Sequence, residues 1–303
     1  MNGKRPLGEF LQKRRSQVRP EEVGLATYGE MRRVPGLRRE ELALLAGVSS
    51  SYYTRLEQGR SSNASPEVLE AIARALDLDE AERLHLHDLA AAQRRPVRPR
   101  RVPPEQVAAS VRQLVSALDD VPVVVLGQRC DVLAWNRSGH LLFAGHLDPE
   151  SPGRSADRPN MAELVFCDGH TRDLYADWQQ KARDVVGTLR LAAGRHPDDP
   201  KLASLIGRLM LRSEEFESLW SDHRVRACPV AVYTMRHPLM GSIEVTQQTL
   251  QAELDQRVVM VTAPPGSASA HALALLARTA HSGRHGARAA QPTTWHQAVH
   301  SES

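Results

Sequence analysis

Hydrophobic residues recur every three to four positions through the first 95 residues, a spacing typical of amphipathic helices. In the first such segment Leu7, Phe10 and Leu11 fall on one face of a helix. Gly47 is suited to end a helix, Ser49 to begin one, and the pair Ser65-Pro66 to open another. The pattern predicts an all-α five-helix domain over residues 1–92, with helices at 6–18, 39–46, 50–58, 65–76 and 79–92.

Beyond residue 104 the pattern changes to a mixture of strands and helices. Residues 122–126 and 131–135 predict a hairpin through Gly127–Cys130. Ile243 and Val245 alternate with polar neighbours, which predicts a sheet with one solvent-exposed face. We therefore expect an α+β domain with an antiparallel sheet over residues 105–277. Further strands are expected at 230–235, 242–249 and 257–262, and helices at 107–118, 174–191, 201–211, 214–220 and 267–277.

Two segments lack a periodic pattern. Residues 93–104, QRRPVRPRRVPP, predict an extended linker between the two domains, because proline restricts the backbone. Residues 278–303 predict a disordered tail. The tail holds His281/His285 and His296/His300, a spacing seen in helical metal sites. Gly283 and Gly286 argue against a helix at the first pair, so we expect no metal site.

Composition adds the distribution of charge. The 303 residues carry a net charge of +3, which divides into +5 over residues 1–101 and −2 over the remainder. A basic first third is typical of a module that binds a polyanion, although it also serves to keep a small domain in solution. Cys130, Cys167 and Cys228 are odd in number and widely spaced, so no disulfide framework is expected. Residues 1–22 lack the apolar stretch of a secretory signal, and no apolar run reaches membrane-spanning length, so we expect a soluble cytoplasmic protein with no membrane partner.

The segment from Arg38 to Arg60, RREELALLAGVSSSYYTRLEQGR, has the pattern of a helix-turn-helix. Ala46 allows two helices to approach closely and Gly47 forms the turn between them. Tyr53 and Leu56 are spaced to anchor the second helix to the core. The alternative is an ordinary helical hairpin, but the AGVS turn and the basic surroundings favour recognition of double-stranded DNA.

The outward side of the second helix carries the candidate DNA-binding residues. Serine bonds to several base edges, and arginine prefers guanine. Arg39 and Arg60 flank the pair of helices and are suited to phosphate contacts, which add affinity without sequence choice. The arginines at 32, 33, 38 and 39 form a further basic cluster, either a DNA-contacting arm or a solvated loop. One recognition helix reads few base pairs, so we expect a homodimer. The base-reading candidates are Ser49, Ser50, Ser51, Tyr52 and Arg55.

Signatures of catalysis are absent from the sequence: there is no GxSxG, P-loop, HExxH or CxxC. Cys167 and His170 are close in sequence, but a predicted turn gives no reason to expect an activated nucleophile. The acidic pairs Asp119-Asp120 and Asp198-Asp199 lie at predicted helix boundaries, where helix capping or solvation explains them. We expect neither enzymatic activity nor a bound cofactor or metal.

Residues 35–60, PGLRREELALLAGVSSSYYTRLEQGR, resemble an XRE (cro/C1-type) helix-turn-helix. Further blocks resemble the ligand-binding half of MmyB-like transcription regulators, so the resemblance covers residues 7–277. These blocks are GQRCDVLAWNRSG, MAELVF, DLYADWQQKARDVVGTLR, AGRHPDDPKLASLIGRL, LRSEEFESLWSDHRVR, RHPLMG and DQRVVMVTAPPGSASAHALALL. The sequence departs from the family at Cys130, where a larger apolar residue is usual, and at Arg158-Pro159-Asn160, where Arg and Asn are usually adjacent.

The resemblance implies a PAS-like second domain that senses a long-chain fatty acid or a similar apolar effector. By family position, Asn136, Arg158 and Asn160 are the candidates to hold a polar head. Aromatic residues gather in this domain, where core packing and a sensor pocket overlap. The aromatic candidates are Trp135, Phe143 and Trp178. The leading hypothesis is a ligand-responsive bacterial transcription regulator; the alternatives are a second domain that only dimerises and, less favoured, an enzyme tethered to DNA.

Overall fold

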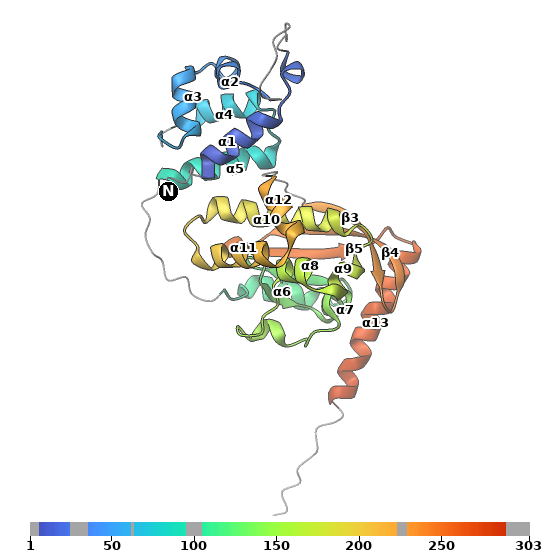
Figure 1. Ribbon diagram of the computed structural model, residues 1–303. Helices are drawn as coiled ribbons and strands as arrows, with labels where there is room; N and C mark the ends of the chain where they lie inside the picture. Colours follow the sequence, from blue (N-terminus) through green and yellow to red (C-terminus); the bar gives the residue numbers. More distant parts are fainter. Residues whose placement is uncertain (1–5, 25–35, 62–63, 95–104, 223–228, 289–303) are drawn as a thin grey trace, which may run out of the picture.

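A computed structural model describes residues 6–24, 36–61, 64–94, 105–222 and 229–288. The chain folds into a helical domain followed by an α+β domain, as Figure 1 shows. The predicted linker, apart from residues 93 and 94, lies outside the described residues, as do Arg32, Arg33, Cys228 and residues 289–303. The fold class expected from the sequence is confirmed.

Five α-helices form the first domain, in the positions that the periodicity predicts. Their apolar faces converge on one core, in which Phe10, Tyr53 and Leu56 are fully buried. Gly47, at φ 65°, forms the left-handed turn after α2, a conformation that glycine adopts without strain. The helices are α1 (Pro6–Gln17), α2 (Arg39–Leu45), α3 (Ser50–Glu57), α4 (Pro66–Ala75) and α5 (Glu80–Arg94), with a short 3₁₀ turn η1 (Pro20–Val23).

The second domain is built on a five-stranded antiparallel sheet in the order β2-β1-β5-β4-β3. The predicted hairpin is therefore an edge pair, and β5 joins it to the second hairpin, β3-β4. The strands are β1 (Val123–Leu126), β2 (Val132–Trp135), β3 (Val230–His237), β4 (Gly241–Gln251) and β5 (Arg257–Thr262).

Most helices of this domain cover one face of the sheet. Ile243 and Val245 point into that large core, whereas Val123, Val125 and Val258 face a smaller core on the other side, closed by α6. At the β3-β4 end the second face is open. Alternate residues of β3 are exposed, and in β4 the buried Ile243 and Val245 alternate with exposed or half-buried neighbours, as predicted for that strand. The helices are α6 (Ala109–Ala117), α7 (Arg137–Ala144), α8 (Met161–Cys167), α9 (Gly169–Leu174), α10 (Trp178–Arg195), α11 (Pro200–Arg212), α12 (Glu214–Ser221) and α13 (Ala268–Arg288), with 3₁₀ turns η2 (Ser151–Gly153) and η3 (Glu253–Asp255).

Three of these helices, α7, α8 and α9, were not predicted from the sequence. Each has only six to eight residues, so its helical period covers about two turns and is a weak signal by itself. Their N-termini are instead specified by side-chain caps, since Asn136, Asn160 and Asp168 accept hydrogen bonds from the first backbone N–H groups of α7, α8 and α9.

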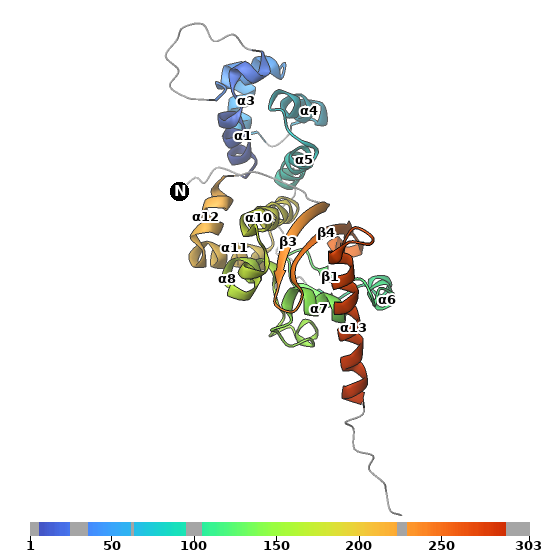
Figure 2. The ribbon, with the colours of Figure 1, turned by 90° about the vertical axis from the view of Figure 1, so that its right-hand side faces the viewer.

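The last helix is longer than predicted. From the sequence this helix was expected to end at Ala277, with disorder from residue 278, but α13 continues through Gly283 and Gly286 to Arg288. Figure 2 shows α13 as one long helix. A glycine costs about 1 kcal/mol relative to alanine within a helix. The helix tolerates this cost because its first turns are already formed, with Leu273 and Leu276 packed into the core. Adding residues to an existing helix avoids the unfavourable nucleation step that starting a new helix requires.

Among the described helices, none combines the length and the apolar character required to cross a bilayer.

Candidate functional site

The helix-turn-helix consists of α2 and α3, which are joined by a turn at Gly47. Val48 packs against the core of the helical domain, and Tyr53 and Leu56 hold α3 to that core from beneath. Ser49 caps α3 by accepting a 3.2 Å hydrogen bond from the Tyr52 backbone N–H. The opposite side of α3 is therefore presented outward in one fixed orientation.

The residues that the sequence assigned to base contacts lie on this outward side. Ser49, Ser51 and Arg55 are exposed, whereas Ser50 and Tyr52 are half-buried. Ser49 Oγ also lies 3.3 Å from Ser51 Oγ, so the cap and a base-reading candidate share a hydrogen bond. The structure thus gathers the five residues along α3, from its cap Ser49 to Arg55 in its second half, and the N-terminal residues of such a helix contact base edges in the major groove.

The two phosphate candidates differ in their surroundings. Arg60 is exposed just beyond the end of α3. Arg39 is half-exposed, and its Nε and Nη2 donate to Glu57 Oε1 at 2.9 and 2.7 Å. Arg39 therefore has a structural partner on α3, a role that the sequence analysis did not assign.

Glu57 is the centre of a buried ion cluster that fastens α3. Its side chain is 1% exposed, and Arg15 of α1 donates to both carboxylate oxygens, from Nε at 2.8 Å and from Nη2 at 3.1 Å. Burial by itself would raise the pKa of Glu57, but the hydrogen bonds and charges of Arg15 and Arg39 outweigh burial and lower that pKa. A glutamate on the inward face of an apolar helix was the sequence signal that could have located this cluster.

A cavity of about 310 Å³ lies between α10 and the large-core face of the sheet. This size is at the lower end of the range for small-molecule sites, roughly 300–1,000 Å³. Apolar side chains from α8, α10, β1 and β5 form part of its wall: Leu126, Met161, Val185, Ala192 and Val259.

Polar groups line the same cavity on the side of α10. Lys181 Nζ donates to Gln247 Oε1 at 2.8 Å and lies 4.8 Å from the centre of the Tyr233 ring. Tyr233 Oη donates to Asp184 Oδ2 at 2.6 Å. The sequence analysis missed these residues, although Lys181 and Asp184 fall three apart on the apolar face of a predicted helix, where charged residues need a reason.

None of the six predicted ligand residues is among those that line this cavity. Asn136 Nδ2 donates to the carbonyls of Leu118 and Val121, both at 2.6 Å, and its Oδ1 accepts from the backbone N–H groups of Val123 and Gly139. The side-chain amide of Asn136 thus joins α6, β1 and α7 through these hydrogen bonds.

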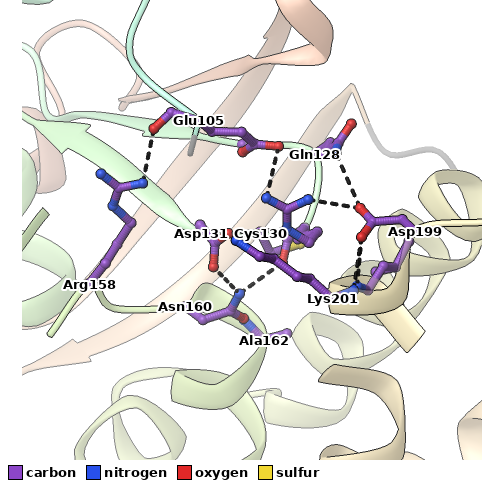
Figure 3. A network of polar contacts seen from close by, with 12 residues as sticks. Glu105, Gln128, Cys130, Asp131, Arg158, Asn160, Ala162, Asp199 and Lys201 are labelled. Atoms are coloured by element: carbon purple, nitrogen blue, oxygen red, sulfur yellow. Dashed lines mark hydrogen bonds and ion pairs between the residues drawn. The ribbon is translucent and has the colours of Figure 1, made fainter. Parts of the chain in front are cut away.

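Arg158 and Asn160 are likewise part of a structural network, shown in Figure 3. Arg158 donates to the Glu105 carbonyl at 3.0 Å, and Asn160 Nδ2 donates to Asp131 Oδ1 at 2.9 Å. At the centre of this network the buried Arg129 forms an ion pair at 2.8 Å with Asp199, which caps α11 as the sequence suggested. These contacts tie the first hairpin to α8 and α11.

The aromatic candidates pack within the domain. Trp135 Nε1 donates to the Pro149 carbonyl, and Trp178 Nε1 donates to the Val165 carbonyl, both at 2.7 Å. Phe143 is buried in the large core. Direct ligand contact by these residues stays a prediction, and the cavity points to a different set.

The described residues contain no group of three or more His, Cys, Asp and Glu side chains placed to hold a metal. Asp168 accepts from the Thr171 backbone N–H as the cap of α9, and His146 Nε2 lies 3.4 Å from its carboxylate. Burial raises the pKa of the Cys167 thiol, which is the opposite of what activates a nucleophile. The neighbourhood of Cys167 is therefore explained by helix capping.

Comparison with known families agrees with this division of the chain. A helix-turn-helix domain family matches residues 6–86, and the family described as MmyB-like transcription regulator ligand binding domain matches residues 107–276. None of the curated proteins matches the chain. Together, the fold, the exposed recognition helix and the second domain define a DNA-binding transcription regulator. The chain belongs to the MmyB-like transcription regulators.

Proposed function

We propose that this protein is a sequence-specific, homodimeric regulator of the XRE type, whose PAS-like second domain adjusts DNA affinity when a small ligand fills the cavity beside α10. The observation that carries this proposal is that α10 contributes both to the wall of the cavity and to the contact with the DNA-binding domain. Lys181, Asp184 and Val185 of α10 line the cavity, and Leu191 of the same helix packs against the core of the helical domain.

The DNA-binding half of the proposal rests on α3. Its exposed serines and Arg55 can form hydrogen bonds with base edges, while Arg60 is placed for a phosphate contact. A single helix of eight residues reads only a few base pairs. Two copies bound to half-sites one helical turn apart provide the specificity that a cytoplasmic regulator needs to find its operator.

The ligand proposed for the cavity is a fatty acid or a similar amphipathic molecule. The apolar wall suits an acyl chain, since each buried CH₂ contributes about 0.8 kcal/mol. The Lys181 ammonium suits a carboxylate head, because it lies at the cavity wall beside the polar Gln247. A cavity of about 310 Å³ favours the shorter acyl chains.

Coupling to DNA follows from close packing of α10 against α5. A methyl group added at Gly194 would lie only 2.6 Å from His85 Nδ1, so the two helices touch at this glycine. A ligand that moves α10 therefore moves the helical domain as well. Ligand must bind the two arrangements with different affinity, because tight binding alone shifts no equilibrium.

One observation favours the alternative that the second domain only dimerises. Polar side chains in the cavity form hydrogen bonds with each other: Tyr233 donates to Asp184, and Lys181 donates to Gln247. These groups therefore have hydrogen-bond partners within the protein and do not require a ligand. The two functions differ in a single measurable property, which is whether a saturating ligand changes the affinity for the operator.

The test titrates saturated fatty acids of increasing length while tryptophan fluorescence and operator affinity are both recorded. We expect affinity to rise with each CH₂ until the cavity is full, and operator binding to change at saturation. Lys181→Met should weaken carboxylate binding, while the matched control Lys201→Met, an exposed position on α11, should not. Fatty-acid binding that does not depend on chain length would refute acyl-chain binding in this cavity. Saturation with fatty acid that leaves operator affinity unchanged would favour a second domain that only dimerises.

A further inference from the structure

A second cavity, of about 350 Å³, lies at the junction of the two domains. Its walls come from α1 and α5 of the helical domain and from α10, α11 and α12 of the second domain. It is as large as the cavity beside α10, and the two share only His196 among their lining residues. A ligand in this second cavity would contact both domains at once.

Most side chains of the junction cavity are apolar or aromatic, although Glu9, Asp199 and His196 also line it. Phe10 of α1 and His85 of α5 form an edge-on ring pair, with centroids 5.2 Å apart. Leu89 of α5 and Ile206 of α11 add aliphatic walls, and Trp220 of α12 closes the cavity from the second domain. Flat or aliphatic bodies gain favourable packing against such walls.

One cation lies among these walls. Arg190 of α10 is 5% exposed; its guanidinium carbon is 4.6 Å from the centre of the Trp220 ring, and Nη2 donates to the Trp220 carbonyl. Burial lowers the pKa of Arg190 to about 10, although the charge of Asp222 raises it. Arg190 thus supplies a buried positive charge at the wall of the cavity, where an anion would form a charge-assisted hydrogen bond with it.

We propose that the junction cavity is a second binding site, specific for a small carboxylate with a flat or short aliphatic body. The body would pack between Phe10, Leu89 and Ile206, and the carboxylate would pair with Arg190. Arginine suits this role because its planar fork of N–H donors matches a carboxylate. Since the walls belong to both domains, the bound molecule fastens the helical domain to the second domain.

Polar contacts outside the lining of this cavity also join the two domains. Arg195 Nε of α10 donates to Asp88 Oδ2 of α5 at 3.1 Å, and Gln17 Nε2 of α1 donates to the Asp222 carbonyl at 3.3 Å. Such partly exposed contacts contribute little individually. A ligand that fills the junction cavity would therefore substantially change how strongly the two domains are held together.

The experiment measures binding of 4-butylbenzoate to the full chain by isothermal titration calorimetry, with 4-butylbenzamide as the uncharged probe. We expect the benzoate to bind at least about tenfold more tightly than the amide, because a charge-assisted hydrogen bond is worth roughly tenfold to a hundredfold in affinity. Arg190→Gln should remove this preference. The matched control Arg183→Gln, at an exposed position of the same helix, should keep it.

Two further variants separate this site from its neighbour and guard against a misfolded Arg190→Gln protein. Ala203→Trp places a large ring at an exposed position of the cavity rim and keeps Arg190, so it should block the benzoate. Lys181→Met alters only the cavity beside α10, so the benzoate binding that depends on Arg190 should persist in this variant. Equal affinity for benzoate and benzamide, undiminished Arg190-dependent binding by Ala203→Trp, or loss of the Arg190-dependent binding in Lys181→Met would each overturn the proposal.

Discussion

Replacing Glu57 with glutamine should destabilise the helical domain far more than an ordinary surface substitution. Glu57 is 1% exposed and accepts hydrogen bonds from two arginines. Removing one partner of a buried ion pair costs about 3–5 kcal/mol, because the other charge stays buried without compensation. Arg15 is buried and accounts for most of this cost, whereas Arg39 has a side chain 42% exposed and contributes at most about 1 kcal/mol. We expect a loss of about 3 kcal/mol, since glutamine still accepts a hydrogen bond.

Urea denaturation of the full chain can assign this loss to the correct domain. None of the four tryptophans lies in the helical domain, and Trp135 and Trp178 pack within the second domain, so tryptophan fluorescence reports mainly the second domain, while far-UV circular dichroism reports both. With m values of about 1–3 kcal/mol/M, the helical transition should shift by about 1–3 M. Glu40→Gln, at an exposed position of α2, is the control and should shift it by less than about 0.5 kcal/mol. If Glu57→Gln lowers the free energy of unfolding of the helical domain by less than about 1 kcal/mol, the reasoning is refuted.

The same cluster predicts a dependence on pH. The folded-state pKa of Glu57 is lowered, so its contribution to stability is fully present above the pKa of the unfolded chain, about 4.3. The contribution is lost as pH falls through the lower, folded-state pKa. The stability difference between wild type and Glu57→Gln should therefore be largest at pH 7 and shrink below about pH 4. A difference that grows on acidification would contradict the assigned direction.

Two further predictions concern DNA binding and the core of the second domain. Arg55→Ala should cost about 1–3 kcal/mol in operator affinity and relax the preference at one base pair, whereas Arg60→Ala should weaken binding to every sequence and flatten its salt dependence; fluorescence anisotropy with operator and random duplexes at several salt concentrations distinguishes the two. Asn136→Ala should destabilise the second domain by at least about 2 kcal/mol, because it strands buried donors and acceptors at α6, β1 and α7. If thermal unfolding shows no such loss, the structural role assigned to Asn136 is wrong.

The helical domain and the sheet were predictable because both depend on local patterns. The period of Leu7, Phe10 and Leu11 defines a helix face whatever that face packs against. The alternation around Ile243 and Val245 likewise identified a strand with one solvent-exposed side. The turn at Gly47 and the cap at Ser49 follow from backbone geometry within a few residues.

The ligand residues were not predictable in the same way, since a cavity is enclosed by segments that are distant in the chain. Lys181 meets Gln247 across 66 positions, and only the packing of α10 on the sheet brings them together. Asn136, Arg158 and Asn160 are polar residues near a sensor core in sequence, but in the structure their hydrogen bonds are used in joining loops and helices.

The sequence by itself therefore determined the two domains, the helix-turn-helix and the outward face of α3, because helical period, turn residues and caps act over short distances. Only the tertiary structure decided that Arg39 pairs with Glu57, that α10 is shared between the cavity and the domain junction, and that Arg190 faces Trp220. Those contacts depend on how whole helices pack, and packing is set by the combined shape and charge of surfaces far apart in sequence.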